Sequence, residues 1–291
     1  MTGYPDYPII DIHVHIQPWW QLLPDVQKTM AHGRDQYDDL LDIMHKPERL
    51  LKLMDDAKIE KAGLINYVAP DLMGFDDSCC EYIIDYCSAH RDRMIPFGSV
   101  NPRLRTDCGA RMRELIDLGL GAVKVHPPHQ LVNVNDYRGP HPHQAEIYEE
   151  CQKAGIPVMI HTGTSIFPGA RNKFAACMPV DDLAVDFPGL SIIMAHGGRP
   201  LYMEEAFFLV RRHKNVYMDI SGIPPARLSD YFPRLEAIAH KVLWGTDWPG
   251  PGVPDLKGNV EKFWELPLRP QTRRAILYDN AAKLLAAGAG T

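Results

Sequence analysis

The sequence predicts a single α/β domain built as a closed (β/α)8 barrel, and three observations lead to this fold class. Short apolar runs alternate with helical patterns along all 291 residues. The strand–helix units number eight, at roughly 30–35 residues each, whereas an open doubly wound sheet usually has fewer. With 45% hydrophobic residues and no internal repeat or linker, the chain can bury one large core, as barrels of about 250 residues do. We therefore expect one domain over residues 1–291.

Each strand is predicted from a short apolar run, and each helix from an amphipathic segment that follows it. The runs cover residues 8–15, 62–68, 94–100, 121–126, 156–161, 190–195, 215–220 and 241–246. The helical segments cover residues 47–57, 77–91, 106–118, 143–154, 179–186, 202–213, 226–238 and 271–285. Pro47 suits the first turn of the first helix, where its missing N–H costs nothing. Glycines at 63, 121, 155 and 189 lie where a helix has ended and a strand begins.

The connection after the first predicted strand is unusually long. It covers residues 16–46 and is rich in aromatic and histidine side chains, namely Trp19, Trp20, His32, Tyr37 and His45. Long connections in compact domains are usually functional. We expect this insert to form a lid or a wall of a substrate site.

Composition excludes several classes of protein. The formal net charge of −6 and the lack of a basic run give no electrostatic footprint for nucleic acid or an anionic membrane. The six cysteines are scattered without a C-x-x-C pair, which argues against a zinc ribbon or a disulfide framework. The N-terminal residues resemble no secretion signal, and no apolar run is long enough to span a membrane. We therefore expect a cytoplasmic protein.

The first strand carries two histidines on one face. Side chains alternate along a strand, so His13 and His15 point the same way while Ile12, Val14 and Ile16 point the other way. Two neighbouring imidazoles are half of a metal site. Alternatively, both are ordinary core histidines that are satisfied by hydrogen bonds.

Later strands end in further polar side chains. Lys124 and His126 close the fourth strand, His161 the fifth, His196 the sixth and Asp247 the eighth. In a parallel barrel the carboxyl ends of the strands line the active-site mouth. A polar group at the end of a buried strand is costly unless it is bonded. Because these groups converge on one rim, the sequence predicts a metal site there.

These motifs resemble the amidohydrolase superfamily, specifically the amidohydrolase-2 branch of metal-dependent TIM-barrel hydrolases and decarboxylases. The motifs are D-x-H-x-H at 11–15, K-x-H-P at 124–127, I-H-T-G at 160–163, A-H-G-G at 195–198 and G-T-D-W-P at 245–249. The resemblance extends from Asp11 to the segment 280–285. It implies that a divalent metal, usually zinc, is ligated by His13, His15, His161 and Asp247. His196 then lies beside the metal.

The residue types suit such chemistry. Three neutral imidazoles leave zinc electrophilic enough to activate water near neutral pH. Asp247 can accept the proton of that water and pass it to the leaving group. His196 can orient the water or polarise a substrate carbonyl, unless it only bonds to backbone in its Gly-rich turn.

Lys124 has several possible roles. In binuclear relatives a lysine on this strand is carboxylated and bridges two metals, and burial near a cation would favour that chemistry by lowering the lysine pKa. Otherwise it binds an anionic substrate group or neutralises Asp247. Since the branch generally carries one metal, we expect one Zn²⁺, with a second divalent metal only if Lys124 is carboxylated. His126 either faces substrate or packs at the strand end.

Other residues are secondary candidates. Asp11, Asp219 and Ser221 share the inward face and are expected to hold ligands in place or to bond structurally. Arg171 and Arg199 follow strands and either hold a substrate carboxylate bidentately or lie on the surface. The tryptophans Trp19, Trp20 and Trp248 either form an aromatic wall for a flat substrate or pack in the core.

The motifs are compatible with three functions for this protein. The first is metal-dependent hydrolysis of an amide, ester or lactone of a small organic molecule. The second is non-oxidative decarboxylation of an aromatic or unsaturated acid, and the third is a barrel that binds metal without catalysis. Lys124 favours the hydrolase because several decarboxylases of the branch lack that lysine, and the complete ligand set disfavours the third. A homodimer is expected only from the habit of the family.

Overall fold

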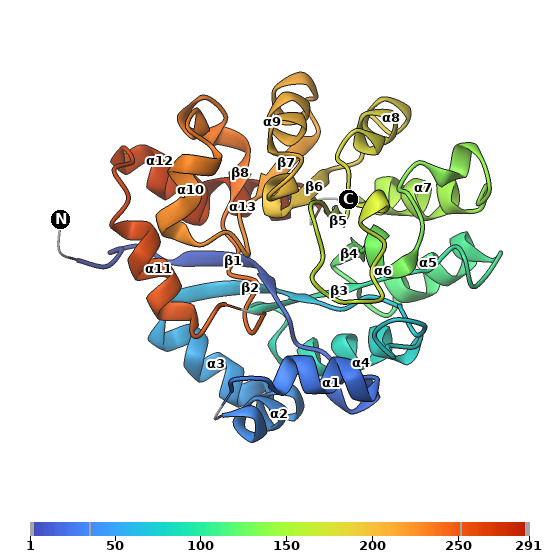
Figure 1. The fold of residues 1–291 in the computed structure, drawn as a ribbon, viewed down its shortest axis with the longest axis horizontal. Helices are drawn as coiled ribbons and strands as arrows, with labels where there is room; N and C mark the ends of the chain where they lie inside the picture. The colour runs from blue at the N-terminus through green and yellow to red at the C-terminus, as the bar shows by residue number, and fades with distance from the viewer. Residues whose placement is uncertain (1–2, 35, 251, 289–291) are drawn as a thin grey trace.

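The computed structural model describes residues 3–34, 36–250 and 252–288. Eight parallel strands form one sheet in which each strand pairs with its neighbour in chain order. The strands are β1 (Ile9–Val14), β2 (Ile59–Ile65), β3 (Met94–Gly98), β4 (Ala122–Val125), β5 (Val158–His161), β6 (Ile192–Ala195), β7 (Val216–Asp219) and β8 (Val242–Leu243). This arrangement confirms the predicted (β/α)8 barrel (Figure 1).

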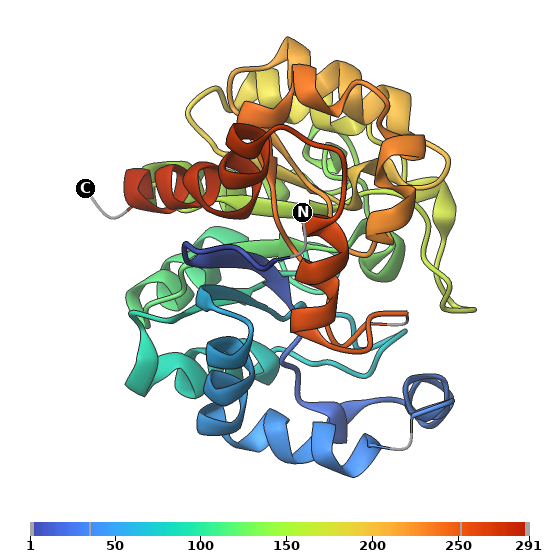
Figure 2. The same cartoon turned by 90° about the vertical axis from the view of Figure 1, so that its left-hand side faces the viewer.

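Helices surround the barrel as an outer layer (Figures 1 and 2). Those that precede β8 connect successive strands, as parallel pairing requires, and the last two follow β8. Their bounds are α3 (Pro47–Asp56), α4 (Ser78–Cys87), α5 (Cys108–Asp117), α7 (Gln144–Ala154), α8 (Pro179–Asp186), α9 (Met203–Arg212), α10 (Leu228–Tyr231), α12 (Pro270–Arg274) and α13 (Asn280–Gly288). No helix in the described part of the chain is long and apolar enough to cross a membrane.

The predicted elements differ from the structure in a few places. Residues 226–238 form α10 flanked by single 3-10 turns instead of one helix, because Pro233 cannot continue a helix and disfavours the helical conformation at Phe232, whose φ and ψ are −128° and 72°. The short α6 (Pro127–Gln130) and α11 (Leu256–Trp264) lie where no helix was expected. Within the last predicted helix, the five residues 275–279 are π-helical between α12 and α13.

The long insert after β1 folds into α1 (Pro24–Ala31) and α2 (Tyr37–His45). It is anchored against α4, since the hydroxyl of Tyr86 donates to the Ile43 carbonyl at 2.8 Å. Gln17 and Met30 from this insert line a cavity at the carboxyl ends of the strands. The insert therefore contributes part of the wall of that cavity.

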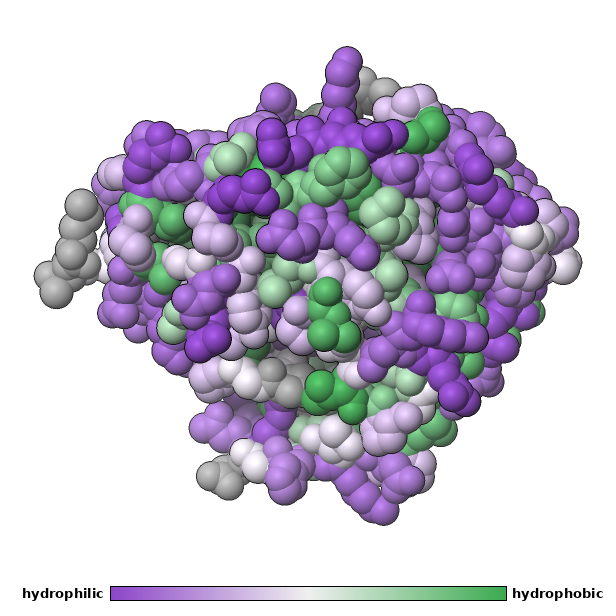
Figure 3. All heavy atoms as spheres, turned by 45° about the horizontal axis from the view of Figure 1, so that its top comes forward, coloured by the Kyte–Doolittle hydropathy of each residue, from purple (hydrophilic) through white to green (hydrophobic). Residues whose placement is uncertain are grey.

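On the face shown in Figure 3, apolar residues are interspersed with hydrophilic ones. Two of the large apolar side chains that are exposed are Leu201, just before α9, and Phe208, within α9. Isolated apolar residues are normal on a protein surface. These side chains do not identify a subunit interface, and the homodimer expected from the family stays a prediction.

The barrel closes where β1 meets the segment after β8. The Ile12 amide donates to the Trp244 carbonyl at 3.0 Å, and the Asp247 amide donates to the His13 carbonyl at 2.8 Å. The buried Asp11 carboxylate joins the same two segments, because it accepts the Thr246 hydroxyl at 2.7 Å and the Thr246 amide at 3.1 Å. Closure and the positions of His13 and Asp247 are therefore coupled.

Thr246→Val is expected to destabilise this closure. The substitution removes the hydroxyl that donates to Asp11 and accepts from the Trp248 amide at 3.2 Å. Because the Asp11 oxygen and the Trp248 amide lose their partners in a buried site, the free energy of unfolding should fall by about 1–3 kcal/mol in urea denaturation. Thr29→Val, on the exposed face of α1, is the matched control. A Thr246→Val protein as stable as the control would contradict the coupling.

Candidate metal centre

The predicted residues gather at the carboxyl ends of the strands. A cavity of about 420 Å³ opens there. Its lining includes His15, Lys124, His126, His161, His196, Arg199 and Asp247. His13 is fully buried beneath them. Side chains from β1, β4, β5 and the turns after β6 and β8 thus share one site.

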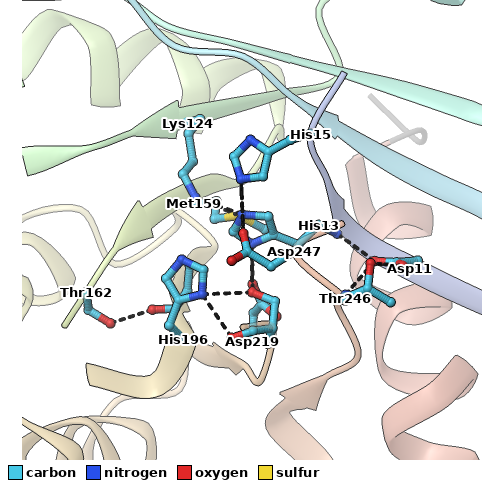
Figure 4. Close-up of polar contacts among 12 residues, drawn as sticks. Asp11, His13, His15, Lys124, Met159, Thr162, His196, Asp219, Thr246 and Asp247 are labelled. Carbon is cyan, nitrogen blue, oxygen red and sulfur yellow. Dashed lines mark hydrogen bonds and ion pairs between the residues drawn. The ribbon is translucent and has the colours of Figure 1, made fainter. Parts of the chain in front are cut away.

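The imidazole of His13 is held in one orientation. Its Nδ1 lies 2.6 Å from Asp219 Oδ2 and 3.0 Å from Ser221 Oγ (Figure 4). Since a carboxylate only accepts, Nδ1 carries the proton and donates it to Asp219. Nε2 is then an unprotonated lone-pair donor. A carboxylate behind a histidine is the usual way to orient a metal ligand.

Three potential ligand atoms converge, one each from His13, His15 and Asp247. His13 Nε2 lies 3.3 Å from His15 Nε2 and 3.4 Å from Asp247 Oδ1. His15 Nε2 lies 3.0 Å from the same Asp247 oxygen. His196 adjoins two of these residues, because the ligand atoms of His13, His196 and Asp247 all lie within 4.8 Å of one another. Imidazole nitrogens and a carboxylate oxygen are a donor set that fits a divalent metal such as zinc.

His196 occupies a turn directly after β6. Its Nδ1 lies 2.9 Å from the Ser221 carbonyl, which can only accept, so Nδ1 carries the proton and Nε2 has the lone pair. Burial and the neighbouring imidazole of His161 hold the pKa of His196 well below its usual range. Neutral His196 can therefore ligate a metal or accept from water at Nε2. It cannot donate from that nitrogen to a substrate carbonyl.

His161 lies beside this group. Its ring centroid is 4.7 Å from that of His196, and it stacks on His126 at 3.8 Å. Its buried Nε2 has no hydrogen-bond partner among the described residues. An unpartnered buried nitrogen on a ring beside His196 is compatible with a metal ligand. His161 is not among the residues whose ligand atoms lie within 4.8 Å of one another, so its role as a ligand stays a prediction.

Asp247 follows β8 in a left-handed conformation with φ of 69°, and His196 has φ of 64°. Non-glycine residues rarely adopt this region, and they do so mainly at functional sites. Burial alone would raise the pKa of Asp247. The hydrogen bond from His15 and the electrostatic interactions with His13 and His15 outweigh burial and lower the pKa. Asp247 is therefore ionised at neutral pH, as a ligand or a base must be.

Glycine is required beside these residues. Gly222 has φ of +62°, and a Cβ there would lie 2.6 Å from an Arg199 nitrogen and 2.8 Å from Asp247 Oδ2. The backbone of the turn after β7 thus approaches the site as closely as packing allows.

Lys124 is fully buried with its ammonium nitrogen inside the site. Nζ lies 3.2 Å from His13 Nε2 and 3.7 Å from Met159 Sδ. Burial lowers the pKa of Lys124, and the nearby carboxylates of Asp247 and Asp219 raise it in part. The amine is therefore easier to deprotonate than a surface lysine.

Asp11 faces away from the cavity, toward Thr246. Besides the two bonds from Thr246, its Oδ1 accepts the His13 amide at 3.1 Å. Burial raises the pKa of Asp11 to about 7, against the opposing effect of these bonds. The carboxylate therefore positions the strand that carries the histidines.

Comparison with known proteins agrees with the sequence motifs and this geometry. A family model described as amidohydrolase, of the amidohydrolase-2 type, matches residues 10–286. The chain belongs to this family. The resemblance inferred from the motifs is thereby confirmed. No curated protein matches the chain.

Several solved structures share the TIM-barrel fold with this member of the family. An uncharacterized TIM-barrel protein from Bordetella bronchiseptica is 24% identical, with a TM-score of 0.75 over 97% of this chain and 99% of that chain. A putative 2-pyrone-4,6-dicarboxylic acid hydrolase from Pseudomonas putida is 19% identical, with a TM-score of 0.62 over 97% and 99%. A 5-carboxyvanillate decarboxylase variant from Novosphingobium aromaticivorans, with bound manganese, is 17% identical, with a TM-score of 0.66 over 97% and 97%.

The candidate substrate residues do not all line the cavity at the carboxyl ends of the strands. Arg199 and His126 line it, and the buried Nε of Arg199 has no partner among the described residues. Trp19 is buried and stacks on Tyr37 at 5.5 Å, so it supports the insert from within. Arg171 is exposed on the loop after β5. Trp248 lines a neighbouring cavity of about 1210 Å³.

Other residues of the cavity were not expected from the sequence. Tyr67 follows β2, and its hydroxyl lies 3.0 Å from His129 Nδ1. His129 Nε2 lies 2.7 Å from Ser165 Oγ, and burial lowers the pKa of His129 to about 3. The signal that could have revealed His129 is its place on α6, three residues after His126, but no element was expected there.

His13→Ala and Asp247→Asn are expected to lose bound metal. Each substitution removes one of the converging ligand atoms, and losing even an outer partner of a ligand costs roughly 10–100-fold in metal affinity. Elemental analysis after dialysis is the measurement, with His143→Ala as the control because His143 is exposed and pairs with Glu146. If either variant keeps the metal content of the control, the assignment of these ligands is wrong.

Proposed function

We propose that this protein is a zinc-dependent hydrolase, which cleaves an amide, ester or lactone of a small anionic molecule. The observation that carries the proposal is the convergence of His13 Nε2, His15 Nε2 and Asp247 Oδ1 within 3.4 Å of one another. Lys124 adds a buried amine to the same site.

The metal would be held by His13, His15, His161 and Asp247, with His196 adjacent. A divalent cation held there supplies a Lewis acid that acidifies water and polarises a substrate oxygen. Ionised Asp247 accepts a proton from the attacking water and returns it to the leaving group. His196 accepts a hydrogen bond at Nε2 and so orients that water.

Two cationic side chains suit an anionic substrate. Arg199 lines the cavity with its Nε unpartnered, and its terminal nitrogen lies 4.0 Å from Asp247 Oδ2. A guanidinium binds a carboxylate through parallel hydrogen bonds. Lys124 provides a second positive charge at the floor of the site. Together they favour a substrate with a carboxylate close to the scissile bond.

Decarboxylation of an aromatic or unsaturated acid is the second candidate. The same two cations would hold the carboxylate that leaves as carbon dioxide. The solved structures that resemble the chain include decarboxylases as well as a hydrolase. Lys124 beside the histidines favours hydrolysis, as the sequence motif K-x-H-P already suggested.

A substrate panel tests the proposal. Wild-type protein loaded with zinc or manganese is assayed on lactones, esters, amides and aromatic acids, with 2-pyrone-4,6-dicarboxylate, 2,6-dihydroxybenzoate and 5-carboxyvanillate among them. We expect ring opening or acyl cleavage of an anionic member, and loss of that turnover in His13→Ala and Asp247→Asn. Release of carbon dioxide from the acids without any acyl cleavage would reverse the order of the two candidates.

A further inference from the structure

A hydrogen-bonded chain of three side chains leads from the cavity to the loop after β5. The Tyr67 hydroxyl lies 3.0 Å from His129 Nδ1, and His129 Nε2 lies 2.7 Å from Ser165 Oγ. Tyr67 and His129 are buried, whereas Ser165 is partly exposed. All three line the catalytic cavity, yet the hydrolytic scheme above uses none of them.

The surroundings of Ser165 favour one direction along this chain. Ser165 Oγ accepts the Phe167 amide at 3.3 Å. Within the described residues, the other partner of this hydroxyl is His129 Nε2. A neutral imidazole accepts at one nitrogen and donates from the other. If Ser165 donates to Nε2, then Nδ1 of His129 donates to the Tyr67 oxygen, and the Tyr67 proton must point elsewhere.

We propose that Tyr67 is a catalytic residue whose hydroxyl donates a hydrogen bond to the substrate oxygen that gains negative charge. His129 and Ser165 are positioning residues that keep the Tyr67 proton directed into the cavity. The inference rests on the proposed hydrolysis, because the acceptor is the carbonyl oxygen of the bond to be cleaved. It assigns to the site a neutral donor besides the cations Lys124 and Arg199.

Ring stacking and further hydrogen bonds hold this hydrogen-bonded chain in place. The ring of His129 stacks on His126 at 3.5 Å, and the ring of Tyr67 lies 4.9 Å from that of His126. On the outer side, the Ser165 amide donates to Asn172 Oδ1 at 2.8 Å, and Asn172 Nδ2 donates to the Ser165 carbonyl at 3.2 Å. A donor fixed in advance stabilises developing charge without the cost of reorganisation.

The Tyr67 hydroxyl also keeps its proton. Burial and the negative charge of Asp247 raise the pKa of Tyr67, against the opposing effect of a hydrogen bond with Gln17, so the phenol is a donor throughout the neutral pH range. A tyrosine in this state stabilises an oxyanion by hydrogen bonding, not by proton transfer.

The direction of the hydrogen bonds from Ser165 through His129 to Tyr67 can be measured without a substrate. Nitrogen NMR of protein labelled with ¹⁵N-histidine distinguishes the two tautomers, and His129→Gln assigns the signals. We expect His129 to carry its proton on Nδ1 in the wild type and in Ser165→Thr, and to shift toward the Nε2 tautomer in Ser165→Ala. An Nε2-protonated His129 in the wild type would overturn the proposal.

Kinetics on the panel compound that the wild type hydrolyses test the role of Tyr67. Tyr67→Phe should lower kcat by about 10²–10³-fold, as loss of an oxyanion donor does, with KM little changed. Ser165→Ala should lower kcat by about tenfold, and Ser165→Thr should restore it. The control is Tyr4→Phe, which removes a hydroxyl bond to the Ala57 carbonyl in the segments that precede β1 and β2, at the other end of the strands from the cavity.

The outcomes separate the two proposals. A Tyr67→Phe protein with normal metal content and a kcat equal to that of Tyr4→Phe would refute the role of Tyr67 while leaving hydrolysis intact. If the wild type hydrolyses no panel compound, the proposed function fails, and the tautomer of His129 still decides whether the Tyr67 proton points into the cavity.

Discussion

The site depends on one short hydrogen bond, between His13 Nδ1 and the carboxylate of Asp219. This bond spans the barrel interior from β1 to β7 and is completely buried. It fixes the proton of His13 on Nδ1, and thereby leaves Nε2 as a lone-pair donor toward His15 and Asp247. Without it the imidazole could present an N–H to the same position, and the convergence of ligand atoms would be lost.

Barrel closure supplies the second constraint. The Asp11 carboxylate links β1 to the segment after β8, so the strand that carries His13 and the turn that carries Asp247 are held together. The left-handed backbone of Asp247 and His196 adds strain at the same edge. The hydrogen bonds and the close approach of Gly222 to Asp247 keep those two residues in place. The hydrogen bonds that stabilise the closed barrel thus also fix the geometry of the site.

Much of this arrangement was predictable from sequence, because strand alternation and the shared edge of parallel strands are local rules. They located the eight strands, His13 and the other polar side chains at the strand ends. Arg171 and Arg199 look alike in sequence, since both follow a strand, and only the folded loops show that Arg199 faces the cavity. Tyr67 and His129 were missed because their hydrogen bond joins segments that are 62 residues apart.

The central claim is that these side chains bind a single divalent metal in a hydrolytic site. A second metal would require carboxylated Lys124, whose Nζ lies 3.2 Å from His13 Nε2. Elemental analysis of wild-type protein purified without chelator and then incubated with zinc or manganese tests this most directly. We expect about one tightly held ion per chain, as catalytic sites with three or four protein ligands hold. Protein that retains no metal under these conditions would contradict it.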